Sequence, residues 1–94
     1  MVLTVKFMGS FRSLSDKRTL KLKLEDPSPI KDVVKLIVAS LPRLEPALID
    51  PGSESPKTSM LVLVNGREIS VLNRFETLIK DGDEVVFVPI VHGG

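Results

Sequence analysis

The chain of 94 residues has the size of one domain, with no room for a second independent core. Thirteen Lys and Arg stand against twelve Asp and Glu, and this balance of +1 argues against direct nucleic-acid binding, which normally shows a clustered basic excess. The absence of cysteine excludes disulfides, thiolate nucleophiles and thiolate zinc sites. No apolar run approaches the roughly 20 residues that span a bilayer, and no secretory signal is evident, so we expect a cytoplasmic protein without membrane contacts.

The first 25 residues predict a β-hairpin. Residues 2–8 alternate apolar and polar side chains, and this period of two is typical of a strand. Residues 9–17 are polar and rich in turn formers, which predicts a loop. Alternation resumes over residues 19–25, with leucines on one side and charged side chains on the other. We therefore expect two antiparallel strands with one buried face.

A change of period after residue 28 predicts the main helix. Ser28 has the chemistry of an N-cap, and Pro29 suits the first helical turn because its missing N–H costs nothing there. Pro42 is expected to end the helix near Ser40 or Leu41. One apolar stripe runs along this helix and consists of Ile30, Val33, Val34, Ile37, Val38 and Leu41.

The second half of the chain predicts an irregular connection followed by strands. Residues 42–59 carry four prolines, with a short helical turn expected at 44–49 and an exposed loop at 51–56. The apolar run 60–64 is closed by Asn65-Gly66, a strong signal for a two-residue hairpin turn.

A short return strand at 67–69, a helical turn at 74–77 and a tight turn at 80–83 lead to the last apolar strand, 84–90. This order of elements predicts an α+β fold with a mixed sheet and one helix across it. The last strand is expected to pair in parallel with the first, because both are apolar enough to lie inside the sheet.

A conventional active site is missing from this pattern. A nucleophilic triad needs a base beside the nucleophile, and the one histidine, His92, lies two residues from the end of the sequence. One histidine with scattered carboxylates is poor material for a metal site. Asp81, Asp83 and Glu84 are interpreted as a solvated turn. We expect a protein that is not itself an enzyme and that binds no metal or cofactor.

The unusual feature is the pair Gly93-Gly94. With glycine at about 7% of average composition, a chance terminal pair should occur in roughly one chain in 200. The pair has a physical use, because a carboxylate that must enter a narrow channel in another protein needs a leading segment without side chains. The alternative interpretation of Gly93-Gly94 is a flexible chain end without a function.

Two segments resemble a known family. Residues 78–94, LIKDGDEVVFVPIVHGG, resemble the C-terminal signature of β-grasp sulfur carriers, and residues 5–14, VKFMGSFRSL, are similar to the first strand and loop of that family. The family includes MoaD, ThiS, the archaeal small modifiers and the ubiquitin-related modifier. The resemblance implies a ubiquitin-like β-grasp domain at 1–90, with four to five strands and one main helix, and a flexible tail at 91–94.

The resemblance also implies a chemistry. A ubiquitin-activating-type enzyme would use ATP to adenylate the carboxylate of Gly94, and a sulfur donor would convert the product to a thiocarboxylate. That group would donate sulfur to molybdopterin, thiamine or tRNA uridine, which implies partners such as a tRNA-thiolating enzyme, and some members attach to lysines of target proteins. Two departures concern the subtype: residues 42–59 are longer than in small members, and Ile90 replaces a second proline.

A docking surface for these partners follows from the apolar runs. Because one helix covers one face of the sheet, the runs 60–64 and 85–90 leave apolar residues on the other face unless residues 44–49 cover them; both outcomes remain open. Arg12 is interpreted either as a contact to a partner or as a solvated surface residue, and Phe75 resembles a partner-facing position, although core filling is favoured for it. His92 is a candidate for a hydrogen bond inside the activating enzyme. The docking candidates are Phe87, Pro89, Ile90, Val91, Arg12 and Phe75.

Two other functions remain open. The chain could be the small subunit of molybdopterin synthase, whose tail enters the active site of the large subunit. It could also be a ubiquitin-like interaction module that uses its sheet face and needs no activation.

Overall fold

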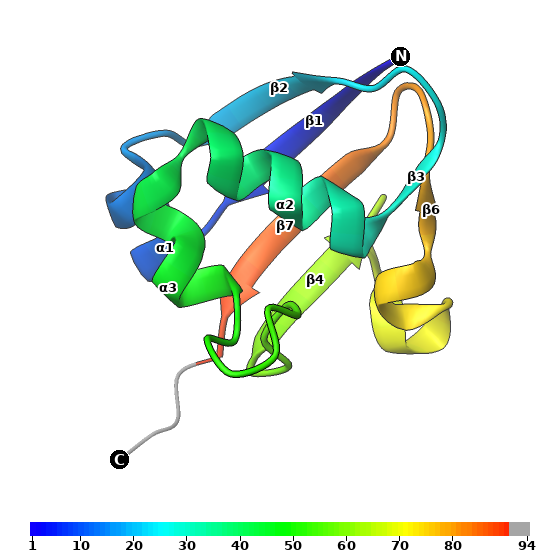
Figure 1. The fold of residues 1–94 in the computed structure, drawn as a ribbon. Helices are drawn as coiled ribbons and strands as arrows, with labels where there is room; N and C mark the ends of the chain where they lie inside the picture. The colour runs from blue at the N-terminus through cyan, green and yellow to red at the C-terminus, as the bar shows by residue number, and fades with distance from the viewer. Residues whose placement is uncertain (91–94) are drawn as a thin grey trace.

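The computed structural model describes residues 1–90, and the expected tail at 91–94 lies outside the described residues. A five-stranded mixed sheet in the order β2-β1-β7-β4-β5 forms one layer (Figure 1). A small second sheet pairs β3 with β6. The strands are β1 Val2–Phe7, β2 Thr19–Lys23, β3 Ser28–Pro29, β4 Met60–Val64, β5 Arg67–Glu68, β6 Leu78–Ile79 and β7 Glu84–Pro89.

The predicted topology is confirmed at the centre of the sheet. β1 and β7 are parallel, with Val5 opposite Val85 and Phe7 opposite Phe87. β2 and β4 flank this pair in antiparallel orientation. Because side chains alternate along each strand, this register sends both phenylalanines to the helix side, where their rings stack with centroids 6.3 Å apart. The centre of the core is therefore built from the first and last strands.

The helix layer covers one face of the sheet (Figure 1). It contains α2 Ile30–Ser40, the 3-10 turn η1 Pro42–Leu44 and the short helix α3 Glu45–Leu48. The predicted apolar stripe of α2 is buried at its first four positions, and Pro42 follows the end of the helix as expected. The helical turn expected at 44–49 is also confirmed, with Leu44 and Leu48 completely buried.

The predicted N-cap at Ser28 is wrong. Pro29 occupies the cap position, and Ser28 Oγ instead donates a hydrogen bond to the carbonyl oxygen of Asp26 at 3.0 Å. The reason is that Ser28 and Pro29 pair with β6 as a short strand, which keeps their backbone extended up to Ile30. The sequence-based prediction missed both β3 and β6, because two-residue strands carry no periodic signal.

The loop predicted for residues 9–17 is also wrong, because this segment begins with a helix, α1 Gly9–Ser15. Phe11 and Ser15 lie one helical turn apart and are both buried, so one side of the turn packs on the core. Asp16 ends the helix in the left-handed region at φ 57°. Seven residues with one apolar anchor are too short for the period-3.6 pattern to emerge from sequence.

Three turns complete the fold. Asn65 and Gly66, both at positive φ, form the predicted hairpin turn between β4 and β5. The 3-10 turns η2 Ile69–Val71 and η3 Arg74–Glu76 then lead to β6. The helical turn predicted at 74–77 thus corresponds to η3.

Candidate partner-docking surface at the end of the last strand

The face of the sheet opposite the helices carries an apolar patch over β4 and β7. Leu61 pairs with Val88 and Leu63 pairs with Val86 across the two strands, so all four side chains share one face. Each is only partly buried, whereas their inward neighbours Val62, Val85 and Phe87 are completely buried. We call Leu61, Leu63, Val86 and Val88 the outer apolar patch.

No described segment covers the outer apolar patch. α3, which contains Leu48, lies in the same layer as α2 and packs on the inner face with it (Figure 1). The possibility that residues 44–49 cover the outer face is therefore wrong. Met8 and Ile90 follow the ends of β1 and β7 and are 50% and 46% exposed. Aliphatic side chains that stay partly exposed together on two paired strands make a candidate surface for binding another protein.

The end of β7 is held firmly beside the start of α1. The Met8 N–H donates a hydrogen bond to the carbonyl oxygen of Phe87 at 3.1 Å. Gly9 follows at φ +54°, and a Cβ added there would lie only 2.9 Å from Pro89 Cγ. Glycine is needed at this position for both its conformation and its contact. These contacts therefore fix the position of the end of β7.

The loop before β7 is fastened by its two aspartates. Asp81 Oδ1 accepts a hydrogen bond from the Val2 N–H at 2.8 Å, which ties the loop to β1. Asp83 accepts two more, from Asn65 Nδ2 at 3.0 Å and from the Lys80 N–H at 2.8 Å. The predicted turn is confirmed. Its two carboxylates have a structural role, because they accept hydrogen bonds that join the turn to β1 and to the β4–β5 hairpin.

The candidate docking residues separate into distinct environments. Phe87 is completely buried against Phe7, so its side chain offers no surface to a partner, and its assignment as a docking residue is corrected to the core. Phe75 is partly buried and packs against the core. Pro89 is partly buried beside Gly9, while Ile90 is exposed. The remaining sites, Val91, His92, Gly93 and Gly94, lie outside the described residues.

The outer apolar patch was detectable from sequence through parity. Once Phe7 and Phe87 are placed in parallel register, the residues on either side of Phe87 must face outward. The sequence-based prediction instead placed Phe87, the bulkiest side chain of the run, on the docking surface. Size favours the core here, because a phenylalanine in the central strand fills the space beneath α2.

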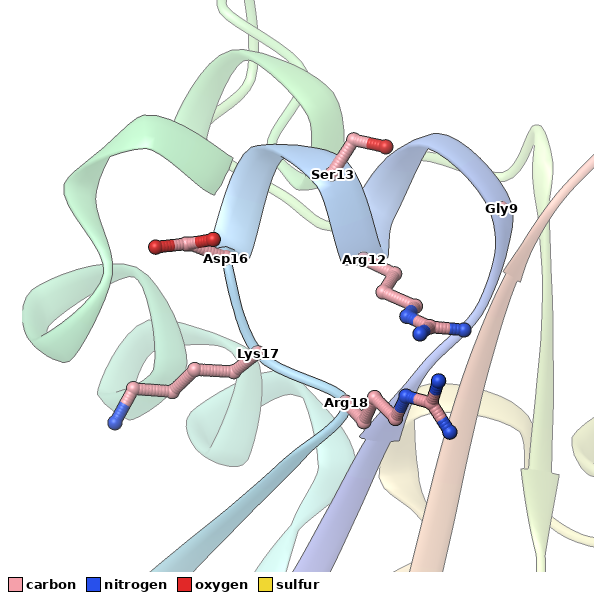
Figure 2. Close-up of a pocket in the computed structure, with 6 residues that line it drawn as sticks. All are labelled: Gly9, Arg12, Ser13, Asp16, Lys17 and Arg18. Carbon is pink, nitrogen blue, oxygen red and sulfur yellow. The ribbon is translucent and has the colours of Figure 1, made fainter.

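Arg12 lies on α1, the helix whose first residue, Gly9, lies beside Pro89. With Arg18 it lines two adjoining surface hollows, the larger of about 600 Å³. Figure 2 shows the two guanidinium groups extending to the same side of the hollow, while Lys17 and Asp16 extend to the other side. Within residues 1–90, the ion pairs are Lys6 with Glu84 and Lys31 with Glu76, so neither arginine is paired with a carboxylate there.

Within residues 1–90, neither a membrane-spanning helix nor a metal-binding cluster is found. No helix in that range combines the length and apolar character needed to cross a membrane. The same range contains no group of three or more His, Cys, Asp or Glu side chains that could hold a metal ion.

Comparisons with known proteins agree with one another. The family model described as Urm1 (Ubiquitin related modifier) matches residues 2–94. Small archaeal modifier protein 3 of Haloferax volcanii is 32% identical over 94 residues, covering 100% of both chains. SAMP1 from Haloferax volcanii has a similar structure, with a TM-score of 0.88, 20% identity and 100% coverage of both chains. A putative molybdopterin converting factor, subunit 1, from Pyrococcus furiosus has a TM-score of 0.74 at 21% identity, covering 97% of this chain and 99% of its own.

Proposed function

The chain belongs to the Urm1 (Ubiquitin related modifier) family of ubiquitin-like modifiers and sulfur carriers, and from that premise we propose that the carboxylate of Gly94 is its reacting group. A partner enzyme of the ubiquitin-activating type adenylates that carboxylate with ATP. The domain supplies the docking surface and the partner supplies the catalytic groups. The observation that carries the proposal is the outer apolar patch, which adjoins a last strand held in place at Pro89.

The geometry limits where the partner's nucleotide site can lie. Gly94 is five residues beyond Pro89, and five extended residues span at most about 17 Å. A partner that covers the outer apolar patch must therefore place its nucleotide within that distance of the end of β7. Gly93 and Gly94 have no side chains, so the leading end of the chain fits a channel that larger residues would block.

The proposed chemistry consists of adenylation of the Gly94 carboxylate and then substitution at its acyl carbon. The Gly94 carboxylate attacks the α-phosphate of ATP, and pyrophosphate leaves, which gives an acyl-adenylate. Sulfide delivered by a sulfur donor then attacks the acyl carbon and AMP leaves, so that a C–S bond replaces the C–O bond to AMP and the carboxylate becomes a thiocarboxylate. A lysine amine of a target protein attacking the same carbon would instead form an isopeptide bond. Sulfur transfer and protein modification therefore share one activated intermediate.

The small-subunit role in molybdopterin synthase is the second candidate. It is favoured by the resemblance of residues 78–94 to the MoaD signature, and the fold resembles that of the Pyrococcus furiosus converting factor. In this role the same thiocarboxylate would enter the active site of a larger subunit. Stable co-purification with one such subunit favours this candidate, whereas attachment to many different lysines favours the modifier.

The direct test of the proposal is the intact mass of the chain purified from its own cells. Activation predicts a fraction heavier by the difference between one sulfur and one oxygen atom, and alkylation of the thiocarboxylate should shift that fraction further. A chain whose terminal carboxylate stays unmodified while its activating partner and sulfur donor are active would contradict the proposal.

A further inference from the structure

The sheet has a free edge at β2, where the chain pairs with β1 on one side only (Figure 1). Two hydrogen bonds mark the ends of this pairing: the Phe7 N–H donates to the Arg18 carbonyl, and the Leu24 N–H donates to the Met1 carbonyl. They show which residues of this segment direct their backbone groups toward β1. In an antiparallel ladder the residues between them alternate. The N–H and C=O groups of Thr19, Lys21 and Lys23 therefore point away from β1, toward solvent.

The edge is strongly basic relative to the rest of the molecule. Residues 12–23 contain five basic side chains and one acidic side chain, a net charge of +4. The whole chain carries thirteen and twelve, so the remaining residues carry eight and eleven, a net charge of −3. A nearly neutral protein thus concentrates its positive charge on β2, the turn before it and the end of α1. This separation was hidden in the overall balance.

The basic residues surround the edge on two sides. Lys21 and Lys23 are exposed on the face opposite the helices, on the same side as Thr19. Arg12 and Arg18 extend to one side of the hollow at the start of β2 (Figure 2). Each guanidinium group can bind a carboxylate through two parallel hydrogen bonds.

We propose that the β2 edge binds an extended acidic segment of a partner protein, which adds to the sheet as a sixth strand. The free backbone groups of Thr19, Lys21 and Lys23 would form the hydrogen-bond ladder. Acidic side chains at every second position of the segment would face the lysines, because cross-strand neighbours lie on the same side of a sheet. The charge also selects against other occupants: a second copy of β2 would place lysine opposite lysine or nearby.

The opposite face of the added strand meets apolar surface. Leu20 is half-buried on the helix side of β2, and Leu14 of α1 and Leu36 of α2 are 39% and 41% exposed. An acidic segment whose intervening residues are aliphatic would therefore match both sides of the edge. This surface is two strands away from β7 and requires nothing of Gly94, so its test stands apart from that of the proposed activation.

The test uses a blocked peptide of alternating glutamate and valine, with hydrogen exchange of the backbone amides as the readout. At low salt and saturating peptide, the amides of Thr19, Lys21 and Lys23 should exchange at least about tenfold more slowly, because each gains a strand partner. The amides of Leu20 and Leu22, which face β1, serve as internal controls and should not change. Binding without protection of the outward amides would overturn strand addition.

Charge reversal supplies the matched variants. The double variant Lys21→Glu/Lys23→Glu should weaken peptide binding by at least about tenfold. Arg67→Glu/Arg74→Glu changes the net charge equally at exposed positions on β5, the opposite edge of the sheet, and on η3, and should bind like the unaltered protein. Equal weakening by both variants would indicate a diffuse charge effect and would contradict the proposal. Tighter binding of oligouridine than of the peptide, or dimerisation through β2, would replace the acidic segment with a different occupant.

Discussion

The two halves of the sheet share one inner face and differ on the outer one. On the helix side, β1 and β2 contribute buried apolar side chains, and so do β4 and β7. On the opposite side, β4 and β7 carry the outer apolar patch, while β2 carries Thr19, Lys21 and Lys23. Because packing on α2 makes the same demand on both halves, core formation does not explain the difference. We attribute it to two docking surfaces, one apolar on β4 and β7 and one basic at the free edge.

The strongest way to break this comparison is to damage the inner face that both halves share. Phe87→Ala removes a completely buried ring that stacks on Phe7, and should cost about 3–5 kcal/mol of unfolding free energy. Urea denaturation followed by far-UV circular dichroism measures this loss. Val88→Ala, one residue along on the outer face, is the control and should cost less than about 1 kcal/mol. Equal losses at both positions would mean that the two faces are not distinct.

A second variant tests the fixed exit of β7. Gly9→Ala should lower the unfolding free energy by about 2 kcal/mol, because alanine meets both a left-handed backbone and the ring of Pro89 at 2.9 Å. Gly66→Ala is the matched control, since its φ is also positive but its Cβ would enter open space. The same denaturation experiment should therefore show a smaller loss for Gly66→Ala. A smaller loss for Gly9→Ala would remove the argument that the close approach to Pro89 matters.

A third variant sharpens the contrast between the outer surfaces. Val88→Asp puts a charge into the outer apolar patch and should reduce activation by the partner enzyme by about tenfold, which corresponds to about 1.4 kcal/mol. Thr19→Asp adds the same charge on β2 and should leave activation unchanged. The rate of ATP–pyrophosphate exchange at subsaturating protein measures both. A larger loss of activation in Thr19→Asp would mean that the activating partner docks on β2, which contradicts the assignment to the outer apolar patch.

The smallest effect is expected on the helix layer, where neither outer surface is touched. The Glu76 carboxylate accepts a hydrogen bond from Lys31 Nζ at 2.8 Å and raises the pKa of Lys31. A raised pKa stabilises the fold below the ordinary pKa of lysine, and this contribution is lost as the pH rises through the folded-state value. NMR titration of the Lys31 amine in Glu76→Gln should therefore give a lower pKa than in the unaltered protein. An unchanged pKa would show that the pair does not persist in solution.

The sequence predicted the fold where its periodicity was long and regular. The stripe of α2 and the parallel pairing of β1 with β7 followed from apolar patterns of five residues or more, and the Asn65-Gly66 turn followed from a dipeptide with specific turn chemistry. α1 was missed because seven residues with Phe11 as the apolar anchor look like a polar loop. β3 and β6 were missed because their pairing joins segments about 50 residues apart, which only tertiary contacts reveal.

The sequence indicated an apolar surface over the last strands but placed Phe87 on the wrong face of the sheet. The two apolar runs indicated a docking face, yet Phe87 was chosen for it although the register with Phe7 sends it inward. The basic edge could not be recognised as one surface from the sequence, for a different reason. Its cations are spread over a helix, a turn and a strand, and Arg12 and Arg18 come together only when α1 folds back beside β1.

The central claim concerns the carboxylate of Gly94, and removing Gly93 and Gly94 tests it most directly. The measurement is ATP–pyrophosphate exchange catalysed by the activating enzyme from the same cells, with the truncated and full chains at equal concentration. We predict that the truncated chain unfolds at the same urea concentration as the full chain and supports no exchange above background. Exchange at the full rate by a truncated chain would contradict the account and leave the protein as a docking module.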